Sequence, residues 1–215
     1  MTIPRNLSIL AEGASAAGVL AATNGGTGLT SPGTSGNVLT SNGTGWTSTA
    51  PGMTLIQTQT ATGTQTSLPF TLPGGVYDTY FMTIFISDGS TLDTYGVQVD
   101  FGSGYITSSY AIYGVRNIGG AVSGFTSTTY ESFRLCNTTS SSYLMGTAFL
   151  TCKKTSATNY RVGFNGAFYQ QGPNGYFPVG YYASSSATPI VGIRLVSTSL
   201  TTSMYATVSL YGISS

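Results

Sequence analysis

A glycine-rich segment from Asn24 to Gly52 limits what this chain can fold into. It contains eight glycines, two prolines and no charged residue. Its large apolar side chains are few and spaced apart: Leu29, Val38, Leu39 and Trp46. Glycine loses much backbone entropy on ordering, and so few apolar groups offer little burial in return. The segment therefore cannot form a core of its own within one copy of the chain.

Two arrangements fit such a segment. One is a flexible linker between better-packed parts. The other is an ordered stalk in which several copies wind together and share these apolar side chains. The turn dipeptide Asn42-Gly43 and the regular spacing of the glycine clusters favour the ordered stalk, because tight turns then fall at defined positions.

The run GGTGLTSPGTSGNVLTSNGTGWTS within this segment resembles a segment found in fibre and spike proteins of tailed bacteriophages. In that family it joins an N-terminal virion-attachment segment to a C-terminal β-rich head, usually in trimers. LPGGVYDTYFMTIFI and the ending TVSLYGISS are similar to the first and last strands of fibre-head β-sandwiches. The resemblance implies three parts: a virion-attachment segment (residues 1–23), a stalk (24–52) and a head domain (53–215).

The residues before the stalk are short, alanine-rich and weakly apolar. Gly13 and Gly18 weaken any helix in this part, and an isolated terminus of this kind would fray. Glu12 interrupts the apolar residues, so we expect no export signal. We expect this segment to bind other virion proteins through its apolar side chains, which are Ile3, Leu7, Ile9 and Leu10.

From residue 53 onward the sequence alternates between apolar and polar residues. Runs such as YFMTIFIS and MYATVSLYGI, bounded by Gly, Pro or Asp, predict about ten strands and no helix. The predicted fold class is all-β, with an extended arm and stalk followed by a jelly-roll-like antiparallel β-sandwich. Because tyrosine alternates with Ser and Thr, we expect each sheet to have one face in the core and one face in water.

Composition excludes several functions. Charged residues make up 6% of the chain, against roughly 25% in an ordinary soluble domain. With a net charge of +1, the chain lacks the basic surface that nucleic-acid binding needs. It contains no histidine, the commonest general base and metal ligand. No apolar run is long enough to insert into a membrane.

Catalysis would have to rely on carboxylates. Asp78, Asp88, Asp93 and Asp100 lie close in sequence, and a glycosidase needs two carboxylates facing a cleft. Turns explain these residues better, since Asp88-Gly89 is a turn signature. Their spacing matches no EF-hand loop. We therefore expect no catalytic residue, no metal and no cofactor.

Cys136 and Cys152 are the only thiols. If residues 131–137 and 142–152 formed a hairpin, Cys136 would lie opposite about Tyr143 rather than opposite Cys152. Two buried, free cysteines are expected.

The aromatic-rich stretch FYQQGPNGYFPVGYY, residues 168–182, is the best candidate for a receptor contact. Aromatic rings stack on the apolar faces of sugars, while side-chain amides bind hydroxyl groups. The alternative is that these rings belong to the sandwich core or to a contact between copies. The candidate residues are Gln170, Gln171, Asn174, Tyr176, Phe177, Tyr181 and Tyr182.

Together these features predict a non-enzymatic phage virion protein. It would be a short homotrimeric tail or head fibre, assembled in the host cytoplasm and incorporated in the virion. Its head would adhere to a host-surface glycan or protein. The alternatives are a polysaccharide-degrading tailspike, a head decoration protein without a receptor, and a cellular adhesin or lectin module, which would need an export signal.

Overall fold

The computed structural model divides the chain into two compact units, Met1–Gly52 and Met53–Ser215. The second unit begins where the sequence predicts the head domain to begin. The structure describes residues 14, 19–22, 26–74, 76–87, 94–135, 143–156, 159–170, 174–185, 187–197 and 204–213. The candidate anchoring residues Ile3, Leu7, Ile9 and Leu10 lie outside the described residues.

The first unit contains a small β-hairpin made of β1 (Val38–Ser41) and β2 (Trp46–Thr49). The turn between them contains the predicted Asn42-Gly43 dipeptide, with Gly43 at a φ of 89°. The Asn42 side-chain oxygen accepts hydrogen bonds from the backbone N–H groups of Thr44 and Gly45, at 3.0 and 2.8 Å. An Asn side chain that binds the following backbone stabilises such a turn locally, without a hydrophobic core.

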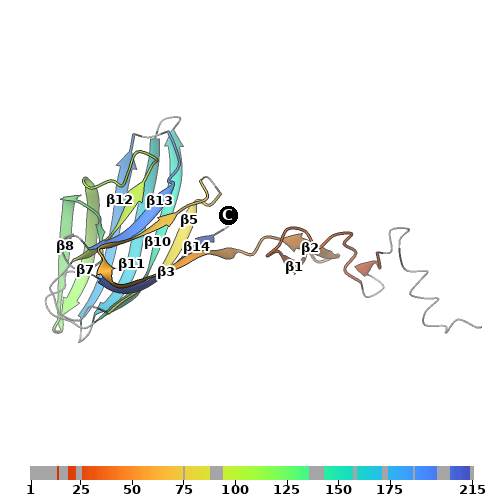
Figure 1. Ribbon diagram of the computed structural model, residues 1–215, viewed down its shortest axis with the longest axis horizontal. Helices are drawn as coiled ribbons and strands as arrows, with labels where there is room; N and C mark the ends of the chain where they lie inside the picture. The colour runs from red at the N-terminus through yellow and green to blue at the C-terminus, as the bar shows by residue number, and fades with distance from the viewer. Residues whose placement is uncertain are drawn as a thin grey trace, which may run out of the picture. The chain divides into compact units, whose positions relative to one another are not determined.

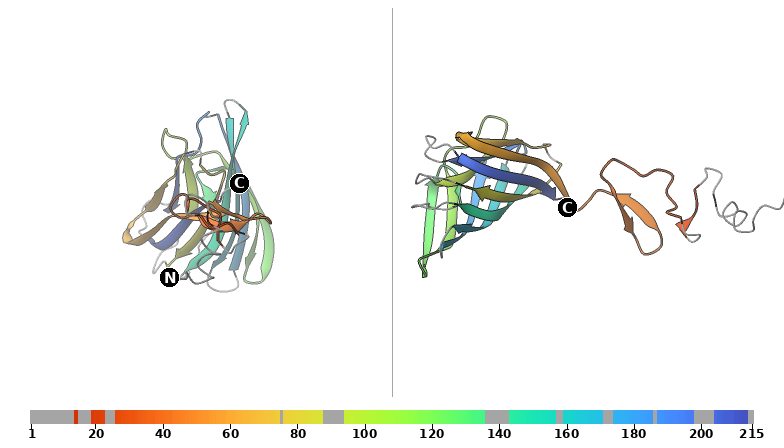
Figure 2. Two further views of the ribbon diagram at one scale, coloured as in Figure 1. Left: turned by 90° about the vertical axis from the view of Figure 1, so that its right-hand side faces the viewer. Right: turned by 60° about the horizontal axis from the view of Figure 1, so that its bottom comes forward.

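The second unit, the head, is a sandwich of two antiparallel sheets (Figures 1 and 2). The larger sheet has eight strands, in the spatial order β3 (Met53–Gln65), β14 (Met204–Ile213), β5 (Thr79–Ile86), β10 (Leu144–Ser156), β11 (Asn159–Gln170), β12 (Asn174–Ser184), β7 (Tyr110–Ile118) and β8 (Ala121–Tyr130). The smaller sheet has four, in the order β4 (Ser67–Thr71), β13 (Gly192–Ser197), β6 (Tyr95–Asp100) and β9 (Phe133–Arg134).

The chain passes repeatedly between the two sheets. β4, β6, β9 and β13 belong to the smaller sheet, and the strands between them in sequence belong to the larger one. This alternation wraps both sheets around one core in the manner of a jelly roll. The predicted all-β, jelly-roll-like antiparallel sandwich is confirmed. The larger sheet carries additional strands, because β10, β11 and β12 run back and forth between β5 and β7.

The core fills the space between the sheets. Alternate residues of the larger sheet point inward and are buried, as in β5, where Tyr80, Met82, Ile84 and Ile86 are at most 2% exposed. An aromatic cluster lies at one side of this core: the ring of Phe133 stacks on Phe164 at 4.9 Å and meets Tyr110 edge-on at 4.7 Å. The Tyr110 hydroxyl accepts a hydrogen bond from the Val99 N–H at 3.0 Å and donates one to the Ile106 carbonyl at 3.1 Å. Tyr110 therefore ties β7 of one sheet to β6 of the other.

Two strands of the larger sheet were not predicted. β8 is rich in Ser, Thr and Gly and has few apolar residues to alternate. β12 contains Pro178 and two glycines, which are typical strand breakers in sequence. The ladder between β11 and β12 is interrupted beside Pro178: it pairs Asn165 with Val179 and resumes at Phe168 with Tyr176. The missing N–H of proline is thus accommodated at a gap in the pairing.

The hairpin considered for residues 131–137 and 142–152 does not form between the strands that the structure describes there. The short strand β9 pairs with β6, whereas β10 pairs with β5 and β11. Cys136 lies outside the described residues, and Cys152 is a buried free thiol, 3% exposed.

Candidate binding surface

The outer face of the larger sheet, on the side away from the smaller sheet, is unusually apolar. On β10 the outward residues Met145 and Phe149 are 42% and 46% exposed, while their inward neighbours Leu144 and Leu150 are buried. We name this surface the outer face. Its exposed apolar side chains, each 42–53% exposed, are Phe85, Tyr113, Val115, Met145, Phe149, Tyr169, Phe177, Val179 and Tyr181.

The larger sheet has one face in the core and one face in water, as predicted, but the centre of the exposed face is apolar rather than rich in Ser and Thr. Cross-strand pairing places the apolar side chains in rows. One row joins Tyr211 of β14, Phe81 of β5 and Phe149 of β10. The centre of the Phe81 ring lies 6.0 Å from that of Tyr211 and 4.8 Å from that of Phe149. Such aromatic pairs stabilise the sheet through cross-strand contacts. The rings nevertheless keep one side free.

Charges are confined to one end of the outer face. Among the described outward positions of the central strands, the charged side chains are Lys153 and Arg161, which pair across β10 and β11. Toward the β3 edge the face becomes hydroxyl-rich. There Thr58 and Ser209 form a hydrogen bond of 2.8 Å. The outer face thus has an uncharged aromatic centre, and its margins combine hydroxyl groups with the exposed apolar side chains of Leu55, Tyr205 and Val122.

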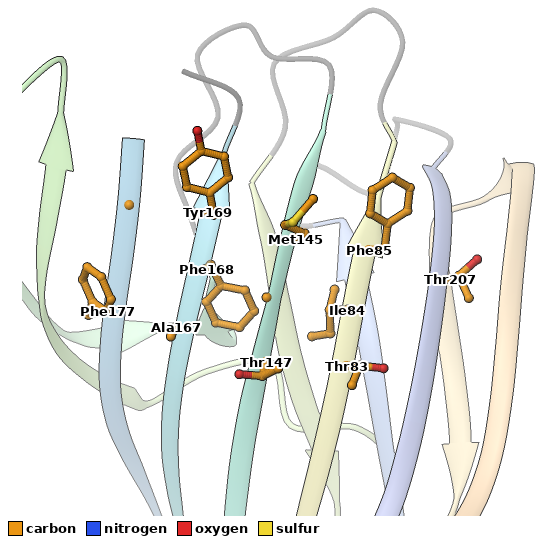
Figure 3. A pocket seen from close by; sticks show the side chains of 12 residues that line it. Thr83, Ile84, Phe85, Met145, Thr147, Ala167, Phe168, Tyr169, Phe177 and Thr207 are labelled. Carbon is orange, nitrogen blue, oxygen red and sulfur yellow. The ribbon is translucent and has the colours of Figure 1, made fainter. Parts of the chain in front are cut away.

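A hollow of about 590 Å³ lies in the outer face (Figure 3). Its rim is formed by Phe85, Met145 and Tyr169, which adjoin one another across β5, β10 and β11, and by Phe177 of β12. Its floor is low because Ala167 and Gly175, which lie on the same face as the rim residues, are small, and the backbone at Gly146 also borders it. Thr83, Thr147 and Thr207 supply hydroxyl groups at its side.

Gly146 is required by close packing. A Cβ atom at this position would lie 2.3 Å from the carbonyl oxygen of Ala167 and 2.4 Å from the Phe168 ring. Contacts this short cannot occur without movement of the backbone. The inward side of β10 therefore accommodates the Phe168 ring only because residue 146 has no side chain.

The structure distributes the predicted receptor stretch over different environments. Gln170 and Tyr176 are only 2% and 3% exposed, so their assignment as receptor contacts is corrected: both belong to the interior. Tyr182 is half-buried and lies 5.2 Å from the Tyr110 ring, within the aromatic core cluster. Phe177 and Tyr181 are exposed on the outer face, at 53% and 45%. Gln171 lies outside the described residues.

The stretch also spans the length of the sheet. Gln170 and Asn174 pair at the end of the sheet where Leu144 and Ile86 pair. Met53 pairs with Ile213 at the opposite end, where the stalk joins the head. Asn174 is fixed at its end by its side-chain oxygen, which accepts a hydrogen bond from the Gly119 N–H at 3.0 Å. We name the end that contains Asn174 the distal end of the head.

The carboxylates of the described residues occupy turn, loop or strand-end positions. Asp100 is the last residue of β6, and its side chain accepts hydrogen bonds from the N–H groups of Gly102 and Gly104, at 2.7 and 3.0 Å. The role predicted for it, a turn carboxylate, is confirmed. Asp88 and Asp93 lie outside the described residues. Within the described part of the chain, no group of three or more Asp, Glu, Cys or His side chains is placed to hold a metal ion.

Burial controls the titration of three side chains in the core. Desolvation raises the pKa of the Tyr80 and Tyr110 hydroxyls well above their usual range. Desolvation, with a smaller effect of Asp78, raises the pKa of the Cys152 thiol from 9.0 to about 12. All three groups therefore stay protonated at neutral pH. A protonated, enclosed thiol is a poor nucleophile.

The stalk leaves its apolar side chains unprotected. Val38, Leu39 and Trp46 are 47%, 49% and 42% exposed, and Leu29 is half-buried. Leu29, Val38 and Leu39 line a common hollow of about 350 Å³ beside Pro32. One copy of the chain thus assembles these side chains without covering them.

No protein-family model matches this chain, and a comparison with curated proteins finds no match. In the part of the chain that the structure describes, no helix has the length and apolarity needed to cross a membrane. What the chain's own residues define is a two-part protein: a glycine-rich hairpin unit followed by an antiparallel β-sandwich with an exposed aromatic face.

Proposed function

We propose that this chain is a non-enzymatic structural protein of a tailed-phage virion. It forms a short homotrimeric fibre, anchored by residues 1–23, whose β-sandwich head adheres to a host-surface glycan or protein. The observation that carries the proposal is the exposure of Val38, Leu39 and Trp46 in a glycine-rich unit directly before the head.

The stalk supports the trimer. Three apolar side chains of the stalk are 42–49% exposed, and the unit has little else to bury. Their exposure favours association, because apolar surface removed from water contributes about 25 cal/mol per Å². The hollow lined by Leu29, Val38 and Leu39 provides a place where an apolar side chain of a neighbouring copy can fit. Closed cyclic symmetry then limits the assembly to a small number of copies.

The distal end of the head supports adhesion. In a fibre held at its N-terminus, the end opposite Met53 is the one that meets a cell surface first. Asn174 and the turn at Gly119 and Gly120 lie at this end, joined by the hydrogen bond from the Gly119 N–H to the Asn174 side-chain oxygen. A side-chain amide can bind the hydroxyl groups of a weakly bound sugar, and trimeric display multiplies weak single-site affinity when the sites engage together.

The proposal is tested first by sedimentation of the purified full-length chain, which should contain three copies. A folded monomer with a protease-resistant stalk would refute the trimer. Purified virions of the parent phage should contain the protein by peptide mass spectrometry. Particles made with a chain lacking residues 1–23 should not contain it. Truncated protein at normal copy number in these particles would show that the anchor lies elsewhere.

A further inference from the structure

We infer that the outer face of the larger sheet is the surface through which neighbouring copies of the head pack against each other. This inference rests on the proposed trimer and assigns a second contact to it, in addition to the stalk. The outer face of one copy binds a second copy of this chain, and the contact is centred on Phe149.

The area of the outer face matches what a stable interface needs. Six of its side chains are aromatic and 45–53% exposed: Phe85, Tyr113, Phe149, Tyr169, Phe177 and Tyr181. At about 200 Å² for each ring, roughly half exposed, they leave about 600 Å² of aromatic surface in contact with water. Monomeric proteins rarely expose apolar patches above roughly 300–600 Å². A standard interface buries about 800 Å² of accessible surface on each partner. The exposed surfaces of Met145, Val115 and Val179 add to the aromatic area and bring the total close to this value.

The distribution of polarity on the outer face also resembles an interface. Protein contacts have an aromatic, charge-depleted centre and a polar, solvated rim. Here the aromatic centre lies on β5, β10, β12 and β7, and Lys153 and Arg161 lie at one end. Toward the β3 edge, Thr58 and Ser209 supply hydroxyl groups beside the exposed Leu55 and Tyr205. A face meant to stay in water would carry charges near its centre, where this chain has none among its described residues.

The chemistry of the outer face points to a neutral partner. An anionic membrane surface or an acidic glycan would require basic side chains distributed over the contact, as would a nucleic acid. This chain is itself close to neutral, with a net charge of +1, and it presents an aromatic surface of the kind required. Around a threefold axis each contact joins one part of a copy's surface to a different part of its neighbour's. The aromatic residues of the outer face extend from β5 to β7, so they can supply both parts of such a contact.

The hollow gains a role in this arrangement. Its rim residues Phe85, Met145, Tyr169 and Phe177 belong to the outer face, and its floor at Ala167 and Gly175 carries no large side chain. A ring from a neighbouring copy fits a hollow of about 590 Å³ and would bury both surfaces. The inference therefore places Phe177 and Tyr181 in a contact between copies rather than in a receptor contact.

Site-specific photo-crosslinking of the full-length chain tests this directly. p-Benzoylphenylalanine placed at Phe149 substitutes one aromatic group for another at an exposed position, so folding should be preserved. The matched control carries the same group at Thr71, an exposed position on β4 of the smaller sheet. Irradiation should join two and three chains from position 149 and leave chains with the group at position 71 uncrosslinked.

The outcomes separate this inference from the proposed function. A trimer by sedimentation that yields no crosslink from position 149, or equal crosslinks from positions 149 and 71, overturns the inference and leaves the stalk-based trimer intact. A monomeric chain overturns both. Crosslinks from position 149 to a host protein or lipid, but not to a second copy, also overturn the inference and identify a different occupant.

A charge substitution supplies a second measurement. Phe149→Glu should reduce crosslinking from p-benzoylphenylalanine at Tyr169 by at least about tenfold, because a carboxylate without a partner loses its hydration in an apolar contact. Val76→Glu is the control, since Val76 is 62% exposed in the loop before β5. Crosslinking that survives Phe149→Glu as well as it survives Val76→Glu would overturn the inference.

Discussion

Replacing Tyr110 with phenylalanine removes a single buried hydroxyl group from the junction between the two sheets. The Tyr110 side chain is 0% exposed, and its hydroxyl is hydrogen-bonded to the Val99 N–H and the Ile106 carbonyl. The aromatic ring and its contacts with Phe133 and Tyr182 would remain. Tyr110→Phe therefore isolates the contribution of this polar link from that of apolar packing.

The expected loss of stability follows from the two bonds. A typical intramolecular hydrogen bond contributes about 0.5–1.5 kcal/mol, and a buried donor left without a partner costs about 1–3 kcal/mol. We therefore expect Tyr110→Phe to lower the free energy of unfolding by about 2–3 kcal/mol. At about 2 kcal/mol per molar urea, the unfolding midpoint should fall by roughly 1 M.

The matched control is Tyr113→Phe, the same substitution three residues along the same strand. Tyr113 points to the outer face and is 45% exposed, so its change should stay within about 0.5 kcal/mol. Urea unfolding followed by circular dichroism, at one fixed chain concentration for all variants, measures both. Equal midpoints for the two variants would refute the reasoning that the Tyr110 hydroxyl links the sheets.

Two further predictions concern the thiol and the carboxylates. Because burial raises the pKa of Cys152 from 9.0 to about 12, the folded state retains this proton above pH 9.0 while the unfolded state releases it. Stability should therefore fall as the pH rises from about 9 to 12, and the fall should be smaller in Cys152→Ser; identical urea midpoints against pH for the two proteins would contradict this. Asp100→Asn should cost about 1 kcal/mol, since the amide oxygen still accepts hydrogen bonds from the turn. Neither Asp100→Asn nor Asp78→Asn should alter the behaviour of purified protein toward host polysaccharide, because we expect no hydrolysis; clearing of a capsular layer by the unmodified chain, lost in either variant, would make the protein an enzyme.

Local sequence pattern was sufficient to predict most of the head's strands. β5 and β14 alternate apolar and polar residues without interruption, so their burial follows directly from the period of two. β12 could not be predicted in this way. Pro178, Gly175 and Gly180 disfavour a strand locally, and only the pairing with β7 and β11 on both sides stabilises it. Tertiary pairing therefore overrides local preference there.

The candidate surface depended on information that a single strand does not contain. Met145 and Phe149 were visible in the sequence as apolar residues, but nothing local indicates that they face away from the core. The rows emerge only when β5, β10 and β14 are in register. The hollow depends on Ala167 and Gly175, whose small size matters only beside the larger side chains of their neighbours. The prediction of receptor contacts at Tyr176 and Gln170 is wrong for the same reason. Side chains alternate between the two faces of a strand, and these two point inward.

An aromatic outer face also affects how the chain finds its strand alignment during folding. In most half-exposed sheets a shift by one residue is strongly penalised, because it exchanges apolar and polar sides. In β10 such a shift would exchange Leu150 with Phe149, so hydrophobicity alone hardly distinguishes the two alignments. Gly146 provides the discrimination, because only a residue without a side chain fits opposite Phe168. A misaligned β10 would place Met145 or Thr147 there and collide with the neighbouring strand. Gly146 therefore fixes the alignment of β10, a central strand of this sheet. Without this requirement for glycine, a head with a shifted β10 could form and remain trapped.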